Sequence, residues 1–131
     1  KKFHEAKVLK QKKVILWGTG NPRREFLYVD DLARACFHVM NLDKNIFNKN
    51  KKTNCSHINV GSSSDLSIRE LAETIKEITG FSGEIDWDQS KPDGMKRKLL
   101  DSKRIFELGW KPDISLKNGI LKAYEDFKNL K

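Results

Sequence analysis

Residues 14–31 read VILWGTGNPRREFLYVDD, and this stretch decides the fold. Its first four residues form an apolar run that is typical of a buried strand. The Gly and Pro residues at 18–22 predict a tight turn after that strand, because both residue types interrupt regular structure. A second short strand is predicted at residues 26–29. The order of strand, turn and strand, followed by signals for a helix, indicates an α/β protein.

The helix after this stretch is expected to begin at Asp30 or Asp31, whose carboxylates can cap its first backbone N–H groups. Leu32, Cys36 and Met40 recur every four residues, which predicts that they form its buried face. On that face Cys36 is expected to be part of the core and not a nucleophile.

The rest of the chain continues this alternation of helices and strands. Ser67 and Glu70 have the spacing of a capping box, and Gly80 is typical of a helix end, so a helix is predicted between them. The remaining elements are predicted from periodicity and from end signals. They are a helix over residues 1–9, an exposed lysine-rich loop over 43–56, strands at 57–61 and 84–87, and helices beginning near Asp101 and Ser115.

The composition narrows the class of protein. A chain of 131 residues has the size of one domain, so one unit over residues 1–131 is expected. A net charge of +8 predicts attraction to phosphate-bearing partners. Two cysteines without a Cys/His cluster predict no metal site and favour a reducing, cytoplasmic setting. No apolar run approaches the ~20 residues of a membrane span, so no membrane partner is expected.

The first nine residues, KKFHEAKVL, are good helix formers, but neither an initiating Met nor an N-cap residue precedes them. We therefore expect the chain to be a portion of a longer protein. The chemistry of any preceding portion would then be absent from this sequence.

Two groups of side chains could bind a phosphorylated ligand. Trp17 and Arg24 flank the turn, where an indole could cover a base and a guanidinium could bind phosphate. Asp93 lies among four cations over residues 91–98, in a loop with a Pro-Asp-Gly turn. The spacing alone equally fits a core Trp beside solvated arginines, and it favours a solvated loop over a binding loop.

Other kinds of site find little support in the sequence. Gly18 and Gly20 lack the third Gly and the following helix of a dinucleotide-binding fingerprint. His4 and His57 are far apart, with no nearby nucleophile, so a hydrolytic triad is not indicated. We therefore predict no cofactor-binding and no catalytic residue within this chain.

Several motifs resemble those of a known family. Residues 24–31 and 108–112, REFLYVDD and LGWKP, resemble segments of the extended short-chain dehydrogenases that act on nucleotide sugars. Further stretches resemble the GDP-L-fucose synthases among them. These stretches are residues 17–26, 56–61, 90–94 and 97–101, which read WGTGNPRREF, SHINVG, SKPDG and RKLLD.

The resemblance implies a fold and a site. It implies that residues 1–131 are the small C-terminal substrate-binding lobe of such an enzyme, of the α/β class, with the Rossmann domain absent. It also implies five ligands of a GDP-sugar, which are Lys2, Trp17, Arg24, Asp93 and Lys98. Lys2 departs mildly from the family pattern, because some relatives have Arg at that position.

The resemblance further implies an activity for the whole enzyme. That enzyme would convert GDP-4-keto-6-deoxy-D-mannose to GDP-L-fucose by 3,5-epimerisation and NADPH-dependent 4-reduction, as a cytoplasmic homodimer. NADP(H) and the catalytic groups would belong to the missing N-terminal domain. This lobe alone would be inactive, and it would expose an apolar patch where that domain packs.

Three alternatives remain open at this level. The chain could belong to another nucleotide-sugar epimerase, dehydratase or reductase that uses UDP or another nucleotide. It could also mediate subunit contacts only. The net charge and three Trp residues suggest a nucleic-acid-binding module. Because no recognition helix or stacking motif is evident, we expect no nucleic-acid partner.

Overall fold

A computed structural model of the chain describes residues 1–48 and 57–130. The described residues group into two compact units, whereas the sequence suggests one. The first unit consists of Lys1–Arg24, Leu66–Lys98 and Lys117–Lys131, and the second consists of Glu25–Asp65 and Leu99–Leu116. Each unit has a hydrophobic cluster of its own, and this explains the division.

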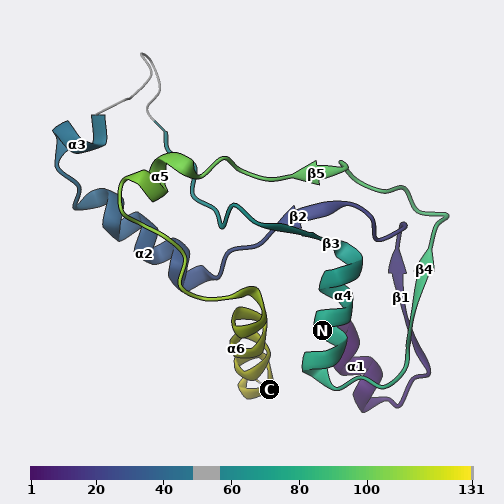
Figure 1. The fold of residues 1–131 in the computed structure, drawn as a ribbon. Helices are drawn as coiled ribbons and strands as arrows, with labels where there is room; N and C mark the ends of the chain where they lie inside the picture. The colour runs from purple at the N-terminus through teal and green to yellow at the C-terminus, as the bar shows by residue number, and fades with distance from the viewer. Residues whose placement is uncertain (49–56, 131) are drawn as a thin grey trace. The chain divides into compact units, whose positions relative to one another are not determined.

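The first unit is built around two parallel strands (Figure 1). In β1 and β4, Lys13 pairs with Glu84 and Trp17 pairs with Asp88. Helix α1 contacts both β1 and α4. These elements are α1 (Lys2–Val8), β1 (Lys13–Trp17), α4 (Ile68–Thr79) and β4 (Glu84–Asp88), and they confirm four of the predicted elements. Their shared core consists of Phe3, Ala6, Val14, Ala72 and Phe81.

Helix α4 has the ends that the sequence predicts. The Ser67 hydroxyl accepts a hydrogen bond from the Glu70 backbone N–H at 3.1 Å, and the Glu70 carboxylate accepts one from the Ser67 backbone N–H at 2.7 Å. The helix ends at Gly80, whose φ of 66° is left-handed. The capping box and the glycine stop are therefore confirmed.

A three-stranded sheet follows the turn after β1, with β2 between β3 and β5. Its strands are β2 (Arg23–Glu25), β3 (Asp65–Ser67) and β5 (Arg97–Lys98). Strand β2 runs parallel to β5, and Arg24 pairs with Lys98. The strand predicted at residues 26–29 is wrong, because the partner strand lies beside residues 23–24 and α2 already begins at Val29.

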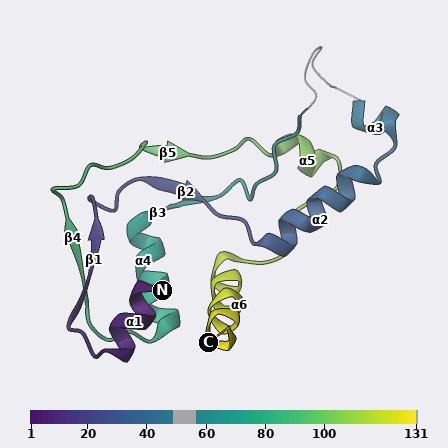
Figure 2. The ribbon, with the colours of Figure 1, turned by 180° about the vertical axis from the view of Figure 1, so that it is seen from behind.

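The described part of the second unit is mainly helical, and its helices can be followed in Figure 2. They are α2 (Val29–Met40), α3 (Lys44–Asn48) and α5 (Lys103–Glu107). Ala35, Ile105 and Trp110 form its buried cluster. Helix α3 corrects the loop predicted over 43–56, whose residues 49–56 lie outside the described part of the chain.

The last helix, α6 (Leu116–Asn129), begins just after Ser115, as predicted.

The buried face of α2 is not the predicted one. Asp31 and Ala35 are its buried residues, whereas Leu32, Cys36 and Met40 are exposed, so the core assignment of Cys36 is wrong. Neither predicted aspartate caps the helix, because Tyr28 is the N-cap. The Asp31 carboxylate instead accepts hydrogen bonds from the backbone N–H groups after α5, at residues 113 and 114. This polar anchor determines which face of α2 points inward.

The strand predicted at residues 57–61 does not form within the described residues. Ile58 and Val60 are half-buried and pack against the cluster of the second unit. The predicted strand is therefore wrong, although two of its apolar residues are packed, because a strand also needs a hydrogen-bonded neighbour. Among the described helices, none is both long and apolar enough to cross a membrane.

Candidate functional site

The turn after β1 requires glycine at two positions. Gly18 and Gly20 both have φ of 78°, a conformation that L side chains rarely adopt. A Cβ atom on Gly20 would lie 2.6 Å from the Trp87 ring, and one on Gly18 would collide with the Asp93 carboxylate. The turn is thereby packed against β4 on one side and against residues 89–96, the loop between β4 and β5, on the other.

Trp17 stands at the end of β1 with 70% of its surface exposed, which argues against the alternative of a core tryptophan. Two ammonium groups lie near its ring. The Nζ atom of Lys2 is 6.0 Å from the ring centroid, and that of Lys91 is 5.9 Å from it. Both distances are compatible with weak cation–π attraction. The result is an accessible indole in a basic environment.

Asp93 is held by the turn. The Thr19 backbone N–H donates to Asp93 Oδ1 at 2.9 Å, and the Thr19 hydroxyl donates to Asp93 Oδ2 at 2.6 Å. The side-chain hydrogen bond from Thr19, followed by the backbone one, lowers the pKa of the Asp93 carboxyl below its ordinary value. Asp93 is therefore ionised at neutral pH, and its loop is anchored.

Arg24 and Lys98 lie side by side on neighbouring strands. They are register partners in β2 and β5, and in-register neighbours on parallel strands project from the same face of a sheet. The Arg24 guanidinium donates to the backbone oxygen of Met95 at 2.7 Å. This contact joins β2 to the same loop that contains Asp93.

All five predicted ligands thus belong to the first unit. Lys2 lies beside Trp17, and Arg24 lies beside Lys98. The loop at residues 89–96 connects the two pairs, because Asp93 binds Thr19 and Met95 binds Arg24. The loop is therefore exposed but anchored to the turn and to β2 by hydrogen bonds.

Arg23 differs from its neighbour Arg24. Its guanidinium lies 3.6 Å from the Glu70 carboxylate at the start of α4. A carboxylate partner lowers the capacity of an arginine to bind phosphate, so Arg24 is the better candidate ligand. The sequence RR does not reveal this difference, because the ion pair joins residues that are far apart in the chain.

Sequence reasoning did not identify Thr19 and Arg69 as part of the site. The Arg69 guanidinium donates to the Thr19 backbone oxygen at 2.5 Å and lies 4.6 Å from the Trp87 ring centroid. Arg69 occupies the first turn of α4 and looks like an ordinary solvated residue in sequence. Only the Gly-Thr-Gly turn itself could have indicated Thr19.

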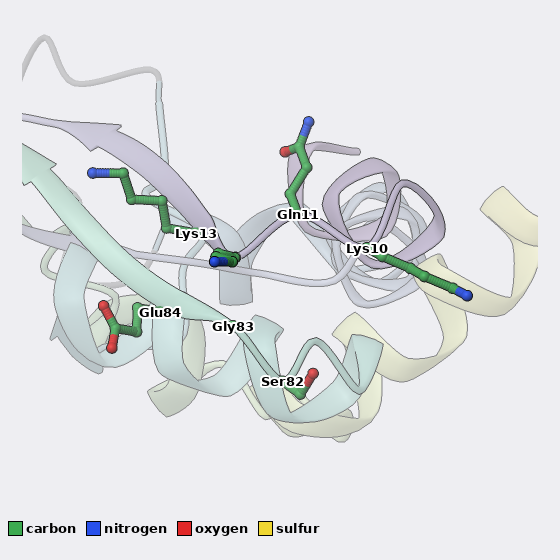
Figure 3. Close-up of a pocket in the computed structure, with 7 residues that line it drawn as sticks. Lys10, Gln11, Lys13, Ser82, Gly83 and Glu84 are labelled. Carbon is green, nitrogen blue, oxygen red and sulfur yellow. The ribbon is translucent and has the colours of Figure 1, made fainter.

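A hollow lies near the start of β1, away from the five predicted ligands, and its lining residues come from the segments that lead into β1 and β4. Figure 3 shows that the side chains of Lys10, Lys13 and Glu84 point in different directions. Lys13 is moreover paired with Asp86 at 2.8 Å. The cations that line this hollow do not converge on one point, so the hollow is a weaker candidate for a ligand site.

The described residues, 1–48 and 57–130, offer little support for a metal site or an acid–base site. No group of three His, Cys, Asp or Glu residues in these ranges could hold a metal ion. His4 hydrogen-bonds the Tyr124 hydroxyl at 3.0 Å, and His38 hydrogen-bonds the Leu108 oxygen at 2.9 Å. These two histidines therefore have structural partners.

The chain is similar to a known family and to several of its enzymes. Residues 1–61 match the model of the NAD dependent epimerase/dehydratase family. A probable GDP-L-fucose synthase 1 from Oryza sativa subsp. japonica is 49% identical over 125 residues, which cover 95% of this chain and 35% of that protein. The GDP-L-fucose synthase of Escherichia coli strain K12 is 47% identical over 127 residues, covering 97% and 40%.

A solved structure agrees with these matches. The GDP-mannoheptose C4 reductase from Campylobacter jejuni, with NADP bound, has a TM-score of 0.83 at 41% identity, covering 97% of this chain and 42% of that one. The chain has a mixed α/β fold that is similar to the fold of this reductase. Over 95 to 97% of its length the chain is similar to these two GDP-L-fucose synthases, which confirms the resemblance inferred from its motifs. It spans about 35 to 40% of the length of these two relatives.

Proposed function

We propose that this chain is the nucleotide-sugar-binding portion of a longer GDP-L-fucose synthase. The whole enzyme would convert GDP-4-keto-6-deoxy-D-mannose to GDP-L-fucose by 3,5-epimerisation and NADPH-dependent 4-reduction. One observation carries the proposal. The five residues that the resemblance assigns to the GDP-sugar belong to one compact unit, on elements joined by the loop at residues 89–96.

The chemistry of each residue suits a GDP-sugar. The exposed Trp17 ring can cover the base or a sugar face, with Lys2 beside it. Arg24 and Lys98 supply two positive charges on one face of a sheet, which suits a diphosphate. The ionised Asp93 carboxylate can accept hydrogen bonds from ribose or sugar hydroxyls. These contacts would position the substrate at a distance from its reacting carbons.

In this proposal the remaining part of the enzyme supplies the redox chemistry. NADP(H) and the catalytic groups would belong to that part, and no residue of this chain has a catalytic role. The NADP bound to the Campylobacter jejuni relative supports this cofactor for the family. The enzyme is further proposed to act as a cytoplasmic homodimer, and this chain alone is expected to be inactive.

The outer face of α2 supports the idea of a missing portion. Val29, Phe37 and Met40 are 66%, 71% and 82% exposed on this helix. Large apolar side chains that are exposed on one helix are typical of a contact surface. We propose that they pack against the remainder of the enzyme.

A second candidate function is the reduction of a GDP-heptose. The observation in its favour is the 41% identity to the Campylobacter jejuni GDP-mannoheptose C4 reductase. Both candidates need the same nucleotide contacts, because both substrates carry GDP. They differ in the sugar, which the residues of this chain do not distinguish.

The test uses the complete gene product that contains this chain. NADPH oxidation is measured with GDP-4-keto-6-deoxy-D-mannose, with a GDP-keto-heptose and with UDP-4-keto-6-deoxyglucose. Fastest turnover of the first substrate supports the proposal, and a preference for the second supports the alternative. Preference for the UDP-sugar would contradict both.

A binding experiment tests the site itself. Calorimetric titration should show GDP binding that weakens about tenfold in Trp17→Ala, because one base-stacking contact is worth about 1–3 kcal/mol. The matched control is Trp110→Phe, which changes a buried tryptophan of the second unit. Equal GDP affinity in wild type and Trp17→Ala would exclude the stacking role. Salt-dependent binding of RNA or DNA tighter than that of GDP would revive the nucleic-acid alternative.

A further inference from the structure

Thr19 holds the Asp93 carboxylate at both of its oxygen atoms. We propose that Thr19 is a positioning residue of the nucleotide-sugar site and fixes the orientation of Asp93 before the ligand binds. This inference rests on the proposed role of Asp93 in binding a GDP-sugar.

The direction of the hydrogen bonds around Thr19 is determined by its partners. The Asn21 backbone N–H can only donate, and it lies 3.1 Å from the Thr19 hydroxyl oxygen. The ionised Asp93 carboxylate can only accept, so the hydroxyl proton lies between Thr19 and Asp93 Oδ2. The Thr19 backbone N–H donates to the other oxygen, Oδ1. With both oxygens engaged by one residue, the carboxylate cannot rotate freely.

The turn that contains Thr19 is itself anchored to α4. Arg69 donates from its guanidinium to the Thr19 backbone oxygen at 2.5 Å and from its backbone N–H to the Gly20 oxygen at 2.9 Å. The same guanidinium lies over Trp87, which packs against the core of the first unit. Asp93 is therefore connected through Thr19 and Arg69 to a buried cluster.

This connection matters because Asp93 lies in an exposed loop. Ordering a side chain on a loop at the moment of binding costs free energy, and a carboxylate that is already oriented avoids this cost. Each carboxylate oxygen has two lone pairs, so each can still accept a hydrogen bond from a ligand hydroxyl. Thr19 thus improves binding without contacting the ligand.

The experiment uses the complete gene product and compares four proteins. They are the wild type, Thr19→Val, Thr19→Ser and Thr74→Val, where Thr74 is a control whose hydroxyl donates to the Glu70 oxygen within α4. We expect Thr19→Val to raise KM for the GDP-sugar about tenfold, because one charge-assisted hydrogen bond is lost. The value of kcat should change little. Thr19→Ser should restore KM to near the wild-type value, because it keeps the hydroxyl. Thr74→Val should match the wild type.

Two results would overturn the inference. One is a wild-type KM in Thr19→Val, and the other is an equal rise of KM in Thr19→Val and Thr19→Ser. If Thr19→Val does not fold, Arg69→Lys replaces it as the decisive variant. Arg69→Lys loses the guanidinium contact with the Thr19 backbone oxygen, and this should raise KM about threefold. An unchanged KM would then reject the connection from Asp93 through Thr19 and Arg69 to the core. Failure of the wild type to bind any GDP-sugar would instead reject the proposed function.

Discussion

The two compact units bury their residues in different ways. The first unit packs an aromatic and aliphatic cluster between two helices and a parallel strand pair. The second has a smaller cluster and a fully buried carboxylate, Asp31, while one face of its main helix remains apolar and exposed. The first unit therefore has the rigid support that a ligand site needs. The second depends on a polar anchor and offers a surface for further packing.

The largest expected effect concerns the core of the first unit. Phe81 is 4% exposed and makes an edge-on contact with Phe3, with ring centroids 5.9 Å apart. Phe81→Ala should lower the free energy of unfolding by about 4 kcal/mol, because it leaves a cavity. Hydrogen exchange should show the loss of protection mainly in β1, β4 and α4. Equal loss across both units would contradict their separate cores.

The next effect concerns the polar anchor of the second unit. Asp31→Ala removes the acceptor of two backbone N–H groups and of the Arg34 guanidinium. Chemical denaturation should show a loss of about 3 kcal/mol, because two partly buried backbone N–H groups and the Arg34 guanidinium lose their acceptor. Asp113→Ala is the matched control, since its carboxylate also pairs with Arg34 but is 67% exposed. A similar loss in both variants would show that the Arg34 ion pair, and not burial, makes the contribution.

A smaller effect compares the starts of two helices. Ser67→Ala removes the capping box of α4 and should cost about 1 kcal/mol in thermal or chemical unfolding. Asp30→Ala at the start of α2 should cost less, because Tyr28 is the N-cap there and makes no side-chain cap hydrogen bond. The reverse order would indicate that Asp30, and not the backbone of Tyr28, stabilises the start of α2.

The smallest effect on stability, but a clear one on binding, concerns Asp93. Its pKa is lowered in the folded state, so its ionised form persists as the pH falls and is lost only below its ordinary titration range. GDP-sugar binding should therefore be retained in mild acid. Thr19→Val raises the pKa of Asp93 and should shift the loss of affinity to higher pH. The measurement is GDP-sugar affinity against pH in the wild type and in Thr19→Val.

Local sequence signals predicted much of the fold of the first unit. The capping box at Ser67, the stop at Gly80 and the turn at residues 18–22 all depend on neighbouring residues, and all are present. In the second unit, local signals predicted the wrong buried face for α2. A period of four residues in α2 identified an apolar face, but the face that contains Asp31 is buried, because partners after α5 satisfy its carboxylate.

The sequence by itself determined the family motifs and the Gly-Thr-Gly turn, because each depends on residue type and short spacing. The five candidate ligands came from the resemblance that those motifs show. Only the tertiary structure decided that Arg23 pairs with Glu70, that Arg24 lies beside Lys98 and that Thr19 holds Asp93. These contacts join residues 47 to 74 positions apart. Hydrogen bonds and ion pairs act over a few ångströms in space, and pairings at such sequence distances leave no periodic pattern in the chain.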